Sequence, residues 1–136
     1  MLTSPAAVAD LKGEWAGVIR MVDHCKRMVI SAFVFGAPGT GIRNFVFNLP
    51  VLLAFDVLRQ ALIAARDQGS FSCKSGNLGP LLSSAKSSLT WTDWQALKEG
   101  VDRRNKIAHD GEIFDQKQCL TDVANIETQL TAWSII

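Results

Sequence analysis

Apolar residues repeat along the chain at alternating steps of three and four positions, which is the spacing of one face of an α-helix. A first series runs through Leu11, Trp15, Val18, Val22, Cys25, Val29 and Ala32. A second comprises Val51, Phe55, Leu58, Leu62 and Ala65. No segment sustains the strict apolar–polar alternation of a half-buried strand. The pattern therefore predicts amphipathic helices throughout.

Two further series occupy the C-terminal half. One comprises Trp94, Leu97, Val101, Arg104 and Ala108, and the other Cys119, Val123, Ile126, Leu130 and Trp133. Residues suited to cap a helix stand at the expected starts, namely Asn48, the pair Thr92 and Gln95, and the pair Asp115 and Gln118. Between the second and third series, residues 78–88 (LGPLLSSAKSS) are predicted to form one or two helical turns.

Four amphipathic series without a strand predict an all-α fold, specifically an antiparallel four-helix bundle. The 136 residues are enough for one domain with its own core, so residues 1–136 are expected to form a single domain. A content of 48% apolar and 20% charged residues is typical of a globular protein.

The remaining features of the chain narrow the location and the chemistry. The start of the chain does not read as a signal peptide, and the apolar runs MVISAFVFG and FVFNLPVLLAF are each too short to cross a bilayer, which predicts a cytoplasmic protein without a membrane partner. Three cysteines and two histidines lack metal-ligand spacing, so reduced thiols and no metal are expected. Net charge is +1, so any contact with RNA needs local clustering of basic residues.

The glycine-rich stretch GAPGTGIR breaks the first helical pattern. The separation of Gly36 and Gly41 matches a phosphate-binding loop, but Ile42 and Arg43 stand where such a loop needs lysine and a hydroxyl residue. We therefore reject a nucleotide-binding loop here.

A polar cluster in residues 98–114 (KEGVDRRNKIAHDGEIF) interrupts the third series. Arg104 falls where that series requires an apolar residue, and a buried guanidinium needs a carboxylate, a phosphate or a partner surface. Asp102, Asn105 and His109 form a neighbouring polar stripe at steps of three and four. Gly111 is placed to end the helix in the left-handed conformation, which puts His109 in the last turn.

The segment RRNKIAHDG resembles the signature of the HEPN superfamily (higher eukaryote and prokaryote nucleotide-binding domains). That signature is an arginine, usually followed by a polar residue, with a histidine four to six positions after the arginine. Arg104, Asn105 and His109 match these three positions, and Ala108 fits the common form. HEPN domains are helical bundles that carry the motif on a late helix.

The resemblance implies endoribonuclease activity without a metal or other cofactor, of the toxin or phage-defence kind. His109 would be the general base on the ribose 2′-hydroxyl, Arg104 would stabilise the phosphate, and Asn105 would orient the histidine or donate to a phosphate oxygen. Arg103 and Lys106 would bind the substrate by adding positive charge. On a continuous α-helix Arg104 and His109 point about 140° apart, so one chain does not bring them together neatly. HEPN proteins usually form dimers in which two motifs line a shared cleft, so the resemblance implies a homodimer. An antitoxin or defence protein is a further expected partner.

One departure from the family and several alternatives remain. HEPN toxins controlled by a nucleotidyltransferase commonly carry a tyrosine two residues after the histidine, but here Gly111 stands there and the chain has no tyrosine. The main alternative is a non-catalytic HEPN-like module that binds a nucleotide or a protein. A structural assembly protein would instead have Arg104 paired to an acid, and the cluster could also be a solvated helix end. His24 is expected to be a structural or surface residue, and the four tryptophans are expected to pack in the core.

Overall fold

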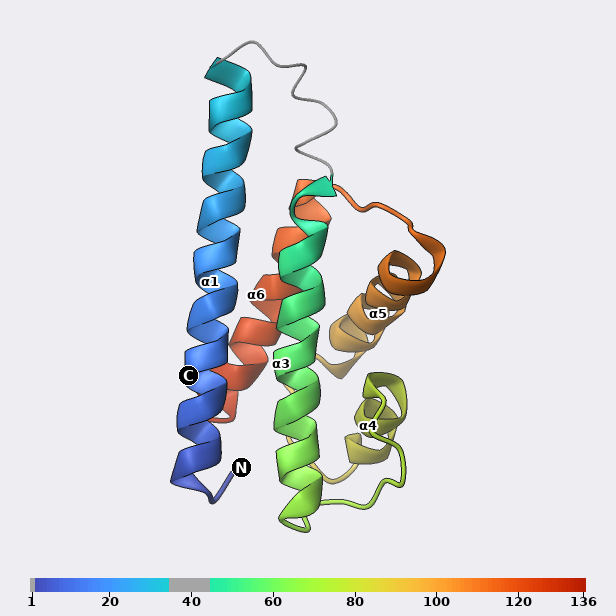
Figure 1. The fold of residues 1–136 in the computed structure, drawn as a ribbon. Helices are drawn as coiled ribbons and strands as arrows, with labels where there is room; N and C mark the ends of the chain where they lie inside the picture. The colour runs from blue at the N-terminus through green and yellow to red at the C-terminus, as the bar shows by residue number, and fades with distance from the viewer. Residues whose placement is uncertain (1, 35–44) are drawn as a thin grey trace.

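The computed structural model describes residues 2–34 and 45–136, and within them the chain is all helical (Figure 1). The α-helices are α1 (Pro5–Val34), α3 (Asn48–Asp67), α4 (Leu78–Ala85), α5 (Trp94–Asn105) and α6 (Gln116–Ala132), and a π-helical turn, η1 (Lys106–Asp110), continues α5. The described residues contain no strand, which confirms the all-α prediction. They contain five α-helices instead of four, because the short segment before α5 forms α4 as a helix of its own.

Helix α3 is the centre of the structure, because it packs against α1, α4, α5 and α6. Figure 1 shows α1 running opposite to α3 along one side, while α4 and α5 lie on the other side. The whole predicted series on α3, from Val51 to Ala65, is at most 1% exposed. Its neighbours on several sides explain why this helix is so apolar.

The length of α3 corrects one expectation. With 20 residues and a mean hydropathy of 1.4 over its most apolar window, α3 is long enough to cross a bilayer, although the apolar runs in the sequence are shorter. In this fold 56% of that window is buried inside the protein, as in the core helix of a globular domain.

Helix α1 contributes another part of the core. The first five residues of its predicted series, from Leu11 to Cys25, are buried, whereas Val29 and Ala32 are only half-buried. The last turns of α1 extend beyond the start of α3 in Figure 1, so they have fewer neighbours among the residues that the structure describes. The GAPGTGIR stretch that follows is Gly36–Arg43, which lies outside the described residues.

The C-terminal helices follow the predicted series with one exception. All five apolar positions from Cys119 to Trp133 on α6 are buried, and so are Leu97 and Val101 on α5. Ala108 was predicted to continue the α5 series but is exposed, while Ile107 packs against the core. The reason is the π turn, whose different step per residue breaks the α-helical period.

Close packing of α5 against α3 depends on Gly100. A Cβ atom at this position would lie 2.6 Å from Cζ of Phe55, a ring that is only 1% exposed, and 3.3 Å from Oδ1 of Asp122. Because the ring has no free space to move into, only glycine allows α5 to approach α3 this closely.

Two of the three predicted helix caps are corrected. Asp115 caps α6 as predicted, with its side chain accepting from the Gln118 backbone N–H at 2.8 Å. Asp93, not Thr92, caps α5, because its carboxylate accepts from the Ala96 N–H at 2.9 Å. Asn48 is the first residue of α3, and its side chain bonds to the backbone of Phe114 instead of capping the helix.

The tryptophans serve packing, as expected. Trp15 and Trp133 are buried, and Trp91 and Trp94 are half-buried against the core. The indole N–H groups of Trp91, Trp94 and Trp133 donate to backbone carbonyl groups, which leaves these three donors unavailable to a base.

Thiol reactivity gives a first test of this packing. Cys25 and Cys119 are 3% and 1% exposed, and burial raises the pKa of both thiols, that of Cys119 to about 12 with the charges of Asp122 and Asp115 adding to the effect. At pH 8 we expect Ellman's reagent to modify Cys73 in the folded protein and all three cysteines only after unfolding.

The thiol of Cys119 makes the stability of the fold sensitive to alkaline pH. In the unfolded chain Cys119 ionises near its ordinary pKa of 9.0, but in the folded chain only near 12, so the folded state retains the proton between these values. Stability should therefore fall as pH rises from about 9 to 12.

The reaction with Ellman's reagent has its own control. A Cys73→Ser variant that still reacts rapidly at pH 8 while folded would contradict the buried placement of Cys25 and Cys119.

Candidate anion-binding pocket at the π turn

The motif Arg104, Asn105 and His109 lies where α5 changes into the π turn η1. The backbone N–H of Gly111 donates to the carbonyl of Lys106, five residues earlier, and the Glu112 N–H donates to the same carbonyl at 3.2 Å. Gly111 adopts φ 66° and ψ 20°, which confirms the predicted left-handed residue at the helix end. His109 lies in this last turn, also as predicted.

The π turn changes where His109 points. A hydrogen bond between residues five apart closes a wider turn than an α-helix does, so two residues separated by five positions approach the same side. Arg104 and His109 have this separation, and with Asn105 they line one pocket of about 570 Å³. The divergence of about 140° applies to a continuous α-helix; here the helix ends in a π turn, and a single chain places all three motif residues on the walls of one pocket.

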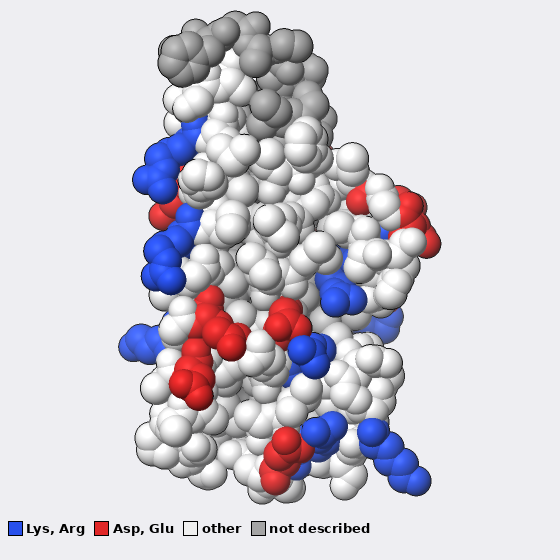
Figure 2. Space-filling view, in the orientation of Figure 1, with Lys and Arg blue, Asp and Glu red and all other residues white. Residues whose placement is uncertain are grey.

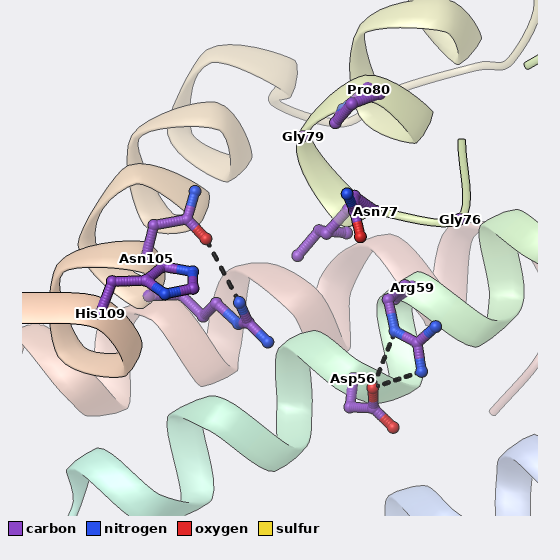
Figure 3. A pocket seen from close by; sticks show the side chains of 10 residues that line it. Asp56, Arg59, Gly76, Asn77, Gly79, Pro80, Asn105 and His109 are labelled. Carbon is purple, nitrogen blue, oxygen red and sulfur yellow. Dashed lines mark hydrogen bonds and ion pairs between the residues drawn. The ribbon is translucent and has the colours of Figure 1, made fainter. Parts of the chain in front are cut away.

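The pocket, here called the Arg104 pocket, has walls from three parts of the chain (Figure 3). Its lining residues are Asp56 and Arg59 of α3, residues 76–80 at the start of α4, and Arg104, Asn105 and His109. In Figure 3, Asn105 and His109 face Asp56 and Arg59 across the space, with Asn77 above them. The packing of α5 and α4 on α3 thus places the motif opposite a second arginine.

Arg104 has no acidic partner among the residues that the structure describes. Its Nη1 donates to Oδ1 of Asn105 at 3.3 Å, and its buried Nε has no hydrogen-bond partner. A guanidinium carries five N–H donors and stays charged at any physiological pH, so this one retains donors for a bound anion. The structural alternative, in which Arg104 is paired to an acid, is not what the described residues show.

Asn105 bonds to the arginine and not to the histidine. Its Oδ1 accepts from Arg104, which leaves its amide N–H groups free to donate toward the pocket. The imidazole of His109 is exposed, and no described side chain holds it by a hydrogen bond. His24, the other histidine, is an exposed residue of α1 outside the pocket.

The adjacent arginine has a different environment. Nε and Nη2 of Arg103 donate to the two carboxylate oxygens of Asp122 at 2.9 and 2.6 Å, and Asp122 is only 3% exposed. The hydrogen bond to this carboxylate raises the pKa of Arg103 further above its ordinary range. Arg103 was expected to bind substrate as a surface charge, but its charge is offset by a buried acid, and it does not line the pocket.

The other charged residues of the motif stay on the surface. Lys106, also predicted to bind substrate, is exposed and does not line the pocket. Asp102 pairs with Lys98 at 2.7 Å on the exposed side of α5, in keeping with its expected role in an ion pair. Asp110 is exposed as well.

Asp56 and Arg59, which form the opposite wall of the pocket, were not predicted from the sequence. Nε of Arg59 donates to Oδ1 of Asp56 at 2.9 Å, Nη2 lies 2.8 Å from the same oxygen, and Gln60 also donates to this carboxylate at 3.0 Å. Asp56 and Arg59 are oppositely charged residues three apart in the middle of a largely apolar helix, which is the signal that could have found them. Their proximity to Arg104 depends on how α5 packs on α3.

Basic and acidic side chains are mixed over this face of the molecule. Figure 2 shows Lys and Arg side chains over the junction of α3 with α4 and α5, with acidic side chains beside them, and a further group of basic side chains along α1. Among the described residues, no group of three His, Cys, Asp or Glu side chains is arranged to hold a metal ion.

Comparison with known proteins adds no relative. No protein-family model matches the chain, and neither a curated protein nor a solved structure matches it. The resemblance to the HEPN superfamily rests on the motif residues themselves.

Proposed function

We propose that the chain is an HEPN-like domain, with α1, α3, α5 and α6 as its four-helix arrangement, and that it cleaves RNA in the Arg104 pocket. The observation that carries the proposal is the convergence of Arg104, Asn105 and His109 on one pocket through the π turn. A guanidinium without an acidic partner next to an accessible imidazole is the combination that phosphodiester cleavage by a 2′-hydroxyl requires.

In the proposed reaction His109 takes the proton from a ribose 2′-hydroxyl. The 2′-oxygen bonds to phosphorus, the bond from phosphorus to the 5′-oxygen breaks, and the 5′-oxygen takes a proton from water as it leaves. The products are a 2′,3′-cyclic phosphate and a 5′-hydroxyl end. Arg104 offsets the charge that grows on the phosphate oxygens, and Asn105 holds Arg104 through Oδ1 while its amide N–H groups donate to the phosphate.

RNA cleavage in the presence of EDTA tests this function. Wild-type protein is expected to cleave RNA in chelator, and His109→Ala is expected to lower the rate by about 10²–10⁴-fold, because the general base is lost. His24→Ala is the matched control, since it removes the only other histidine from an exposed site outside the pocket.

A cyclic phosphate at the new 3′ end identifies the chemistry. Equal rates for wild type and His109→Ala would point to a contaminating nuclease and contradict the proposal.

A non-catalytic module that binds a nucleotide through the same pocket is the second candidate. It is favoured by the presence of a single imidazole in the pocket, with the one carboxylate there already bonded to Arg59 and Gln60. A homodimer, which the resemblance implies, would supply a second histidine as the acid for the leaving oxygen. Nucleotide binding that Arg104→Ala abolishes, without turnover, would identify the binding module. An antitoxin or defence protein stays a proposed partner.

A further inference from the structure

Asn48 connects the start of α3 to the segment that follows the motif. It is 6% exposed, and its side chain forms two hydrogen bonds with the backbone of Phe114, 66 residues away. Nδ2 donates to the Phe114 carbonyl at 3.0 Å, and the Phe114 N–H donates to Oδ1 at 3.0 Å. Nδ2 also donates to the Phe45 carbonyl at 3.2 Å. The amide thus pairs with one peptide unit as a neighbouring backbone would.

Phe114 lies in the segment that leaves the π turn. Gly111 ends the turn, the chain then has no regular secondary structure until α6 begins at Gln116, and Phe114 is the point in this segment that Asn48 holds. At the other end of the turn, Arg103 is held by the buried carboxylate of Asp122 through two hydrogen bonds. The π turn is therefore fixed on both sides by polar contacts with other helices.

These two contacts flank a rare element. π turns occur mostly as single turns in or at the ends of α-helices, often at functional sites, and here contacts with other helices lie on both sides of the turn. If the segment after His109 were released, the chain could relax toward a continuous α-helical turn. The side chain of His109 would then leave the side of the helix on which Arg104 lies.

We propose that Asn48 is a positioning residue, which acts through the Phe114 backbone to hold the π turn in the form that places His109 in the Arg104 pocket. The consequence for catalysis rests on the proposed function; the consequence for the geometry of the turn does not.

The chain offers a matched control in Gln129, a second buried amide that fixes a loop. Gln129 is fully buried, its Oε1 accepts from the Thr92 N–H at 2.8 Å, and its Nε2 donates to the Thr90 carbonyl at 3.2 Å. None of these residues lines the Arg104 pocket. Asn48→Ala and Gln129→Ala therefore remove the same kind of contact, but only the first acts next to the π turn.

NMR of the two histidine side chains and of the Gly111 amide tests the proposal. Asn48→Ala is expected to shift the imidazole signals of His109 and to speed hydrogen exchange at Gly111 at least about tenfold, while Gln129→Ala leaves both as in wild type. His24→Ala assigns the signals, since only two histidines are present. In RNA cleavage, Asn48→Ala should lower kcat by about 10- to 100-fold with little change in KM, because the base is misplaced but the phosphate contact of Arg104 remains.

A second variant keeps the test open if Asn48→Ala does not fold. Asn48→Asp has the same shape, still accepts from the Phe114 N–H and places its charge at the start of α3, where a negative charge is favourable. Its second oxygen cannot donate to the carbonyl groups of Phe45 and Phe114 and faces them as an acceptor, so it should show an effect of the same kind. Unchanged His109 signals and Gly111 exchange in a folded Asn48 variant, or equal changes in Gln129→Ala, would overturn the proposal. A wild-type protein that cleaves no RNA would overturn the proposed function alone, because the NMR result still decides the role of Asn48.

Discussion

Replacing Arg103 with alanine is expected to lower the free energy of unfolding by about 3–5 kcal/mol. The substitution leaves the carboxylate of Asp122 in a site that is 3% exposed, with Gln118 Nε2 at 3.4 Å as its remaining hydrogen-bond donor from another side chain. A buried charge that loses its partner retains its full cost of desolvation. Removing one member of such a pair is therefore more destabilising than replacing both members with apolar residues. Urea unfolding followed by circular dichroism measures the change.

Two controls separate the buried pair from an ordinary surface pair. Lys98→Ala breaks the exposed Lys98–Asp102 ion pair on the same helix and should change stability by no more than about 0.5 kcal/mol. The double variant Arg103→Met with Asp122→Leu removes both charges and should recover most of the lost stability. If Arg103→Ala is within about 1 kcal/mol of wild type, Arg103 is not a structural residue, and its earlier assignment to substrate binding regains support.

Replacing the neighbouring arginine, Arg104, with methionine is expected to lower the rate of RNA cleavage without lowering stability. RNA cleavage should fall by about 10²–10³-fold, as when one donor to a developing oxyanion is removed. Stability should stay the same or rise by about 1 kcal/mol, since a buried donor without a partner, Nε of Arg104, disappears. Loss of function with no loss of stability is typical of a residue kept for binding or catalysis.

The measurement combines cleavage rates with unfolding curves for the same variants. Arg20→Met is the control, because it removes an exposed arginine of α1 outside the pocket and should change neither quantity. Arg104→Lys keeps the charge without the planar fork and should retain part of the activity. A clear loss of stability in Arg104→Met would mean that Arg104 supports the fold, and it would contradict the proposed role.

The contrast between Arg103 and Arg104 shows how much of the site could be predicted from the sequence. Arg104 was identified because it interrupts an apolar series, and the structure places it in a pocket without an acidic partner. Arg103 was expected to be a surface charge because its partner is 19 residues away on another helix. A signal for that partner was present, since Asp122 falls three residues after Cys119 and four before Ile126, on the buried face of α6.

The sequence by itself determined the all-helical class and the core faces of α3 and α6 through the apolar period, and the left-handed residue at position 111 through its glycine. These features depend on residues a few positions apart. Only the tertiary structure decided that α5 ends in a π turn, that Asn48 holds Phe114, and that Arg59 faces the motif across a pocket. The last two depend on contacts between residues far apart in the chain, and the proposed role of Asn48 makes the π turn depend on such contacts as well. No local pattern encodes such contacts, because the energy that selects them arises only once the helices have packed.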